Sequence, residues 1–237
     1  MSTELTRRAI GWGIPDALFV WAGAGFIGLF AAFPVATADD IDPLYTFGVL
    51  LPVQQFAVLG ALVLVSKAKG RGSLRSDFGL EVRAADARFL WLGPALQGAF
   101  WLALLPLVWL GGDTGNQQLV EELKRTREFL PVVLFVLGAV VMAPIVEETL
   151  YRGLLFRALL RRASPGTAVF VSAFIFAAVH FLGDPNAFRS LPALAALGVF
   201  LALRALRTGS LSSSILIHAG FNLTTTVLVL IAPDNLA

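Results

Sequence analysis

The chain has 237 residues and a mean hydropathy of +0.78, with 57% hydrophobic and only 14% charged residues. Because a soluble domain carries charge on roughly a quarter of its residues, this composition excludes an ordinary soluble protein and indicates an integral membrane protein. The formal net charge is only +2, and we expect membrane lipid but no nucleic acid among the partners of the chain. The absence of cysteine excludes disulfides and thiolate metal ligands.

The apolar residues form long runs and not the short alternating segments of an outer-membrane barrel. Runs of about 20 residues suit transmembrane helices. Such runs occur at about residues 14–33, 44–65, 89–110, 129–160, 167–182, 188–206 and 211–232. We therefore expect an all-α, polytopic membrane helix bundle of about seven transmembrane helices.

The charges in the loops predict the orientation of the chain. The first loop, residues 39–43, is acidic, whereas the second carries six basic residues between Lys67 and Arg88. With the N-terminus in the cytoplasm, 14 of the 18 Lys and Arg residues fall on the cytoplasmic side, as the positive-inside rule requires. A short polar helix expected at residues 117–128 is the main exception, because it carries Lys124, Arg125 and Arg127.

No repeat or low-complexity segment divides the chain. We expect residues 1–88 to form an N-terminal transmembrane hairpin with a basic cytoplasmic loop, and residues 89–237 to form a core that contains the polar motifs. The expected location is the plasma membrane of a prokaryote.

Two carboxylates and an arginine lie inside the fourth apolar run, at Glu147, Glu148 and Arg152. An ionisable side chain at the bilayer centre costs roughly 2.5–3.5 kcal/mol, so these groups must pair or face a wet interior. Glu148 and Arg152 are four residues apart on one helix face, which favours an ion pair. Glu147 points about 100° away and lacks a local partner, so it could act as a base. Pro144 is expected to kink the helix nearby.

The two histidines of the chain, His180 and His218, lie in two other apolar runs. In an antiparallel hairpin that turns at residues 161–166, His180 reaches the depth of the unpaired carboxylate. Asn222 follows His218 by four residues and shares its helix face. Each residue alone has a structural explanation, and Phe176 is expected to pack and to orient His180. Together, polar groups on three helices predict a wet chamber in the cytoplasmic half of the membrane.

The spacing of these residues forms three motifs, Glu147-Glu148-x-x-x-Arg152, Phe176-x-x-x-His180 and His218-x-x-x-Asn222. In this order they resemble the CPBP family of intramembrane proteases, the CAAX protease and bacteriocin-processing group, also called Abi. The resemblance covers about residues 90–232 and implies a membrane endopeptidase whose catalytic core is formed by the last four spans. It implies a peptide or lipidated protein substrate, such as a prenylated or precursor peptide, cleaved near the cytoplasmic side.

Residue by residue, the resemblance implies that Glu147 and His180 activate a water molecule. His218 and Asn222 would stabilise the oxyanion. The supporting residues implied by the motifs are Glu148, Arg152 and Phe176.

The cofactor is unknown and could be zinc, with Glu147, His180 and His218 as the candidate ligands. We favour Glu147 as a base without an obligatory metal. As a zinc ligand it would leave only Glu148, which is tied to Arg152, to act as the base.

Two other classes of function remain open. A proton- or ion-coupled transporter also needs intramembrane carboxylates and histidines, although the chain shows no repeat and an odd number of spans. A non-catalytic member of the same family could act as a scaffold or immunity protein, although all motif positions are intact.

Overall fold

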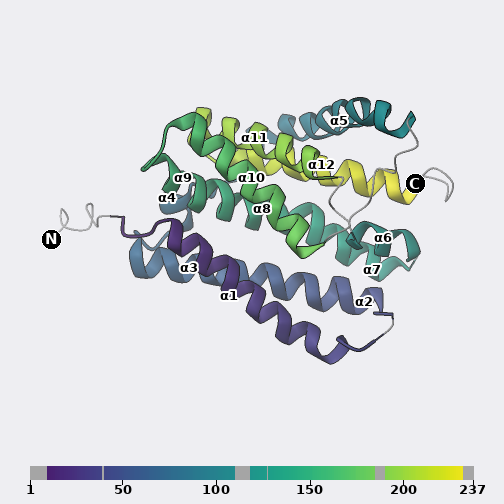
Figure 1. Ribbon diagram of the computed structural model, residues 1–237. Helices are drawn as coiled ribbons and strands as arrows, with labels where there is room; N and C mark the ends of the chain where they lie inside the picture. Colours follow the sequence, from purple (N-terminus) through teal and green to yellow (C-terminus); the bar gives the residue numbers. More distant parts are fainter. Residues whose placement is uncertain (1–9, 39, 110–117, 127, 185–189, 232–237) are drawn as a thin grey trace.

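The computed structural model describes residues 10–38, 40–109, 118–126, 128–184 and 190–231, with helices as their only regular secondary structure (Figure 1). The α-helices are α1 (Ile14–Ala32), α2 (Pro43–Tyr45), α3 (Leu51–Lys69), α4 (Leu74–Phe78), α5 (Leu92–Trp109), α6 (Gln118–Arg125), α7 (Phe129–Phe135), α8 (Ala143–Glu148), α9 (Phe156–Leu160), α10 (Pro165–Gly183), α11 (Leu191–Thr208) and α12 (Ser212–Ile231). Two 3-10 segments, η2 (Phe33–Val35) and η4 (Ala84–Trp91), and three π-helical segments, η3 (Thr46–Leu50), η5 (Val136–Met142) and η6 (Thr149–Leu155), adjoin them.

Six helical segments in the described part of the chain are long and apolar enough to cross a membrane. They are Ile14–Val35, Pro43–Lys69, Phe129–Leu160, Pro165–Leu182, Leu191–Thr208 and Ser212–Ile231. The α5 helix occupies the position of the remaining predicted span. The all-α membrane bundle is therefore confirmed, with seven as an approximate number of spans. Some predicted features lie outside the described residues. They are three helix boundaries, at residues 110, 188 and 232, and the basic residue Arg127.

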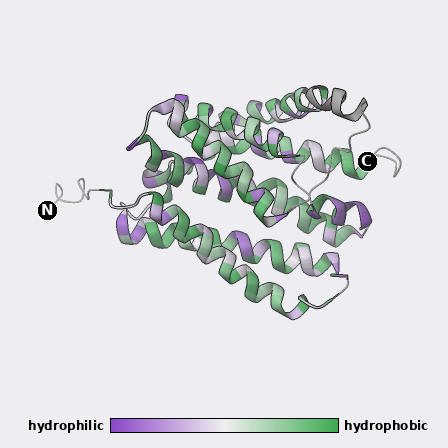
Figure 2. Cartoon of the chain, viewed as in Figure 1, coloured by the Kyte–Doolittle hydropathy of each residue, from purple (hydrophilic) through white to green (hydrophobic). Residues whose placement is uncertain are grey.

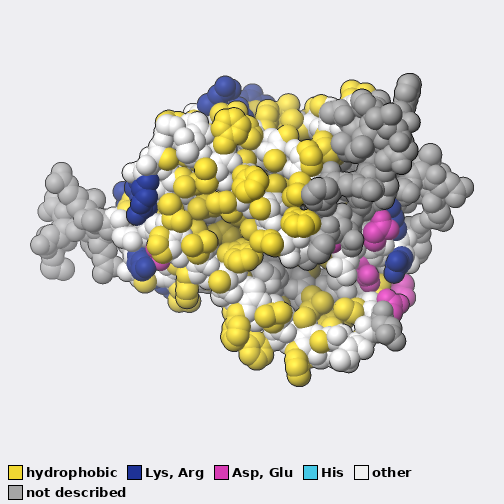
Figure 3. Space-filling model, viewed as in Figure 1, with side chains coloured by type: hydrophobic (Ala, Val, Ile, Leu, Met, Phe, Trp, Pro, Cys, Tyr) yellow, Lys and Arg dark blue, Asp and Glu magenta, His cyan; other side chains and the backbone are white. Residues whose placement is uncertain are grey.

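The long helices lie side by side, with α1 and α3 along one edge of the bundle and α5 along the opposite edge (Figure 1). Colouring by hydropathy shows apolar residues along their length and hydrophilic residues near α4 and α9 at one end and near α6 at the other (Figure 2). The middle of the face seen in Figure 3 is mainly hydrophobic, and Lys and Arg lie around it: toward the end at which α1 begins, at the top of the view, and beside Asp and Glu at the opposite end. This distribution suits a bundle surrounded by lipid.

Glycine allows two segments far apart in the sequence to touch. A Cβ atom added to Gly93 would collide with the backbone of Gly220 in α12, and one added to Gly220 would collide with the carbonyl of Leu90. The start of α5 and the middle of α12 therefore pack backbone to backbone, the close approach that small residues allow in membrane proteins.

The segment from Phe129 to Leu160 alternates between α-helical and π-helical turns. The π-helical segments η5 and η6 lie on either side of α8, which contains Pro144 and the two adjacent glutamates, Glu147 and Glu148. Proline has no N–H to donate to the preceding turn, which is a physical reason for irregular backbone here. The sequence predicted a kink at Pro144, and the structure shows wide turns before and after it. Such turns are frequent at functional sites.

The wide turns of η5 leave backbone carbonyls that bind side chains of other helices. The Gln55 side chain in α3 donates to the Gly138 carbonyl at 2.9 Å, and the Asn222 side chain in α12 donates to the Ala139 carbonyl at 2.8 Å. Both bonds connect α3 and α12 to the helix that contains Glu147. They give this part of the helix fixed neighbours on two sides.

The N-terminal end of α1, the α3–α4 loop and the turns α9–α10 and α11–α12 lie at one end of the bundle (Figure 1). We expect this end to face the cytoplasm. Because the chain has no cysteine, Ser73→Cys in the α3–α4 loop gives a single labelling site. A membrane-impermeant maleimide should label it only after cells are permeabilised. The matched variant Ala38→Cys should be labelled in intact cells, and the reverse pattern would contradict this orientation.

Candidate active site

The three motifs meet between α8, α10 and α12. The Oε2 atom of Glu147 lies 3.8 Å from Nε2 of His180 and 3.9 Å from Nε2 of His218. These residues come from three different membrane-spanning helices, as the sequence predicted. The Glu147 and His180 side chains keep 27% and 22% of their surface exposed, whereas His218 keeps only 4%. Water or a substrate can therefore reach the first two residues.

The neighbouring carboxylate is fully buried and forms the predicted ion pair. Glu148 Oε1 accepts a hydrogen bond from Arg152 at 2.9 Å, and neither side chain has exposed surface. A second guanidinium nitrogen of Arg152 donates to the Gly198 carbonyl in α11 at 3.2 Å. The guanidinium also lies 4.4 Å from the ring centroid of Phe176. Arg152 thus connects its own helix to α10 and α11.

The hydrogen bonds made by the Nδ1 atoms determine the tautomer of each neutral histidine, and therefore whether its Nε2 atom carries a proton or a lone pair. His180 Nδ1 lies 2.7 Å from the Phe176 carbonyl, which can only accept, so this nitrogen donates. His218 Nδ1 lies 3.1 Å from Glu148 Oε1, which already accepts from Arg152, so this nitrogen donates to a carboxylate. When neutral, both rings therefore present a lone pair on Nε2 toward Glu147.

Glu147 Oε2 is a buried acceptor without a hydrogen bond among the described residues. Its distances to the two Nε2 atoms are too long for direct hydrogen bonds. A polar gap of this size is one that a single water molecule can bridge. The expectation that Glu147 lacks a local partner is confirmed for this oxygen.

Phe176 contributes more than the packing expected from its sequence. Its ring centroid lies 4.6 Å from that of His180, 5.8 Å from that of His218 and 5.2 Å from that of Tyr151, and the residue is fully buried. Its carbonyl also holds His180 in one tautomer. Phe176 therefore fixes both histidines, and the sequence offered no signal for the contacts with His218 and Tyr151.

Asn222 lies one turn beyond His218 and is half-buried. One amide hydrogen is used in the bond to the Ala139 carbonyl, and the second amide hydrogen has no partner among the described residues. Asn222 thus joins α12 to η5, and the structure places it one helical turn from His218 without a side-chain hydrogen bond to Glu147 or to either histidine among the described residues.

The set of Glu147, His180 and His218 is chemically suited to zinc, but the two separations measured from Glu147 Oε2 are wider than those between ligands of one zinc ion. Ligand atoms around tetrahedral zinc lie about 3.3 Å from each other, as follows from metal–ligand distances of 2.0–2.1 Å. The observed separations are wider, and the described residues contain no group of three His, Asp or Glu side chains arranged to hold a metal.

Fold and site together define a polytopic helical membrane protein with a partly buried cluster of two glutamates, two histidines and an arginine. Residues 129–224 match the family model of the Rce1-like type II CAAX prenyl endopeptidases. This match begins at α7, ends within α12 and includes all three motifs, and it confirms the predicted family for residues 129–224. It indicates a membrane endopeptidase of the CAAX type. No curated protein and no solved structure matches the chain significantly.

Proposed function

We propose that the protein hydrolyses a peptide bond of a membrane-associated substrate, such as a prenylated or precursor peptide, near the cytoplasmic surface. The observation that carries this proposal is the position of Glu147 Oε2, a buried and unsatisfied acceptor that lies within 4 Å of two histidine Nε2 atoms. Peptide hydrolysis requires a base that removes a proton from the attacking water molecule.

In the proposed reaction, a water molecule binds between Glu147 and Nε2 of His180. Glu147 accepts a proton as the water oxygen bonds to the peptide carbonyl carbon, and the carbonyl oxygen becomes an oxyanion. Collapse of this intermediate breaks the C–N bond, and the proton held by Glu147 or His180 passes to the leaving amine. Atoms and charges balance without a further reactant.

His218 and Asn222 are proposed to stabilise the oxyanion. Asn222 can do so with the amide hydrogen that is not bound to Ala139. His218 can donate from Nε2 only as an imidazolium, because its Nδ1 already donates to Glu148. The Glu148 carboxylate would balance that positive charge, as a carboxylate does for the histidine of a catalytic triad.

Peptide products provide the most direct test. Membranes from cells that produce wild type or Glu147→Gln should differ in peptide fragments, identified by mass spectrometry of newly formed termini. Purified wild type in liposomes should then cleave the identified precursor, and removal of its lipid group tests whether prenylation matters. A precursor that is transported across the liposome membrane without cleavage would contradict the proposal and favour a transporter.

Zinc content tests the proposed water-based chemistry. We expect purified, active protein to contain less than stoichiometric zinc and to keep its activity after treatment with a chelator. The reason is the wide spacing of the three candidate ligands. One tightly bound zinc per chain, lost together with activity in His180→Ala and His218→Ala, would overturn this expectation.

A further inference from the structure

A second polar site lies away from the proposed active site, where α1 begins. A pocket of about 440 Å³ opens there, lined by residues 10–13, Pro15, Asp16, Lys69, Arg161 and Arg162. It brings together the start of α1, the end of α3 and the turn between α9 and α10. These three elements lie at the end of the bundle that we expect to face the cytoplasm.

The pocket carries more positive than negative charge. Lys69 forms an ion pair with Asp16 at 2.6 Å, so their charges compensate. The second oxygen of Asp16 accepts from the Gly13 backbone N–H at 2.8 Å, which caps α1. Arg161 and Arg162 therefore remain as two uncompensated cations. Burial, and secondly the charge of Arg162, lower the pKa of Arg161.

Two lining residues have donors that nothing in the described part of the chain uses. The Arg162 side chain has no hydrogen bond or ion pair there, and its guanidinium lies 3.4 Å from where a Cβ of Gly13 would be. Trp12 is 97% buried, yet its indole Nε1–H has no acceptor. Arg161 holds the tryptophan in place, because it donates to the Trp12 carbonyl and lies over the indole ring at 4.2 Å.

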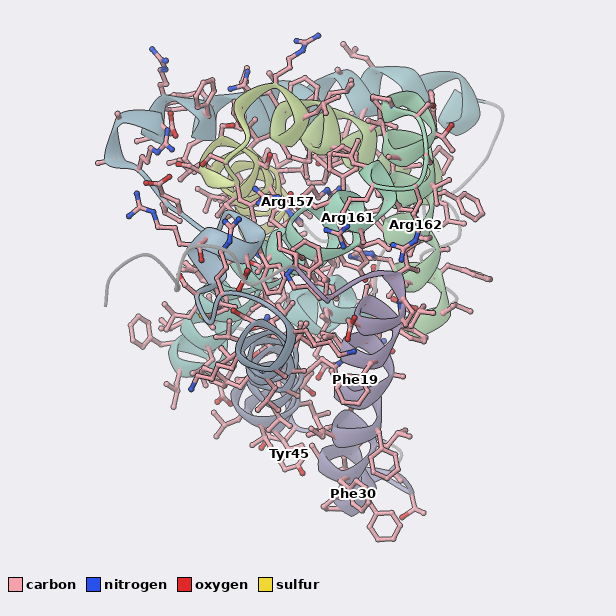
Figure 4. All side chains as sticks on the ribbon, turned by 90° about the vertical axis from the view of Figure 1, so that its left-hand side faces the viewer. Phe19, Phe30, Tyr45, Arg157, Arg161 and Arg162 are labelled. Carbon is pink, nitrogen blue, oxygen red and sulfur yellow. The ribbon has the colours of Figure 1, made fainter. Side chains whose placement is uncertain are left out.

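The surface below the pocket is apolar. Within two turns of its start, α1 exposes Leu18 and Phe19, which keep 59% and 61% of their surface accessible. Figure 4 shows Arg161 and Arg162 near the start of α1, and Phe19 and Phe30 further along the same helix. A cationic pocket at the membrane boundary with an apolar helix face beneath it matches a phospholipid, with a headgroup phosphate above and acyl chains below.

We propose that this pocket binds the phosphate of an anionic phospholipid, with the exposed guanidinium of Arg162 as the donor and the lipid chains along α1. A free phosphate ion shares the headgroup chemistry but would not use the apolar face of α1. The proposal concerns lipid binding and does not depend on the proposed peptidase activity.

The test uses the full chain purified in neutral detergent with equal amounts of phosphatidylglycerol and phosphatidylcholine. Native mass spectrometry gives the ratio of the two bound lipids. Wild type should retain phosphatidylglycerol preferentially. Arg162→Gln should lower its affinity about fivefold, the effect of one basic residue at an anionic membrane surface. Since the Arg162 side chain is exposed and unpaired, folding should not change.

Arg207→Gln is the matched control. It removes one exposed arginine from the last turn of α11, at the same end of the bundle but outside the pocket, and should leave the ratio unchanged.

Three results would overturn the proposal. An equal loss of phosphatidylglycerol binding in Arg162→Gln and Arg207→Gln would show a general attraction of the basic surface for anionic lipid. Displacement of the lipid by excess inorganic phosphate would show a site for the free ion. Equal retention of the two lipids by wild type would show that the pocket does not select an anionic headgroup.

Discussion

Glu147→Gln should lower the rate of peptide hydrolysis by about 100- to 10,000-fold while the protein remains folded. Glutamine has nearly the size of glutamate and can still hydrogen-bond, so the packing around α8 should persist. An amide cannot accept a proton from water near neutral pH. The measurement is the initial rate of cleavage in liposomes, with the thermal unfolding midpoint in detergent as the test of folding.

Comparison with other variants separates loss of the base from general damage. His180→Ala should be similarly inactive, because His180 is proposed to share the water. Asn222→Ala should lose about 100- to 1,000-fold, the usual cost of one oxyanion donor. Glu128→Gln, the same substitution at the exposed start of α7, should retain full activity. Cleavage by Glu147→Gln near the wild-type rate would remove Glu147 from the mechanism.

Arg152→Ala and Glu148→Gln should each destabilise the fold by about 3–5 kcal/mol, because each leaves a buried charge without its partner. Arg152 has the larger number of contacts: it binds Glu148 and Gly198 and lies over the Phe176 ring. Glu148→Gln also changes the acceptor of His218. Both proteins should therefore lose activity and show a lower yield of folded protein and a lower unfolding midpoint.

The matched controls for this prediction are Arg207→Ala and Glu128→Gln, which alter exposed side chains of the same types. Both should unfold at the wild-type temperature. If Arg152→Ala and Glu148→Gln also unfold there, the pair does not stabilise the fold.

Much of the site could be predicted from the spacing of its residues along the helices. The interval of four residues predicted the ion pair of Glu148 with Arg152, and the antiparallel hairpin predicted that His180 approaches Glu147. Both are present in the structure. These predictions succeed because helix geometry determines which nearby residues share a face.

The contacts that complete the site could not be predicted in this way. The carbonyls of Phe176, Gly198 and Ala139 are acceptors that every residue type has, so only the three-dimensional arrangement identifies them. The pocket at the start of α1 likewise joins Trp12 to Arg161, which are far apart in the sequence. Helical spacing carries no information about such long-range pairs.

The π-helical turns of η5 make the length of this segment as important as its composition. Adding or removing one residue in an α-helix rotates everything beyond it by about 100°. A deletion within Val136–Met142 that restored α-helical turns would keep either the bonds from Gln55 and Asn222 or the direction of Glu147, but not both. During evolution this stretch should therefore accept exchanges of one apolar residue for another far more readily than any insertion or deletion.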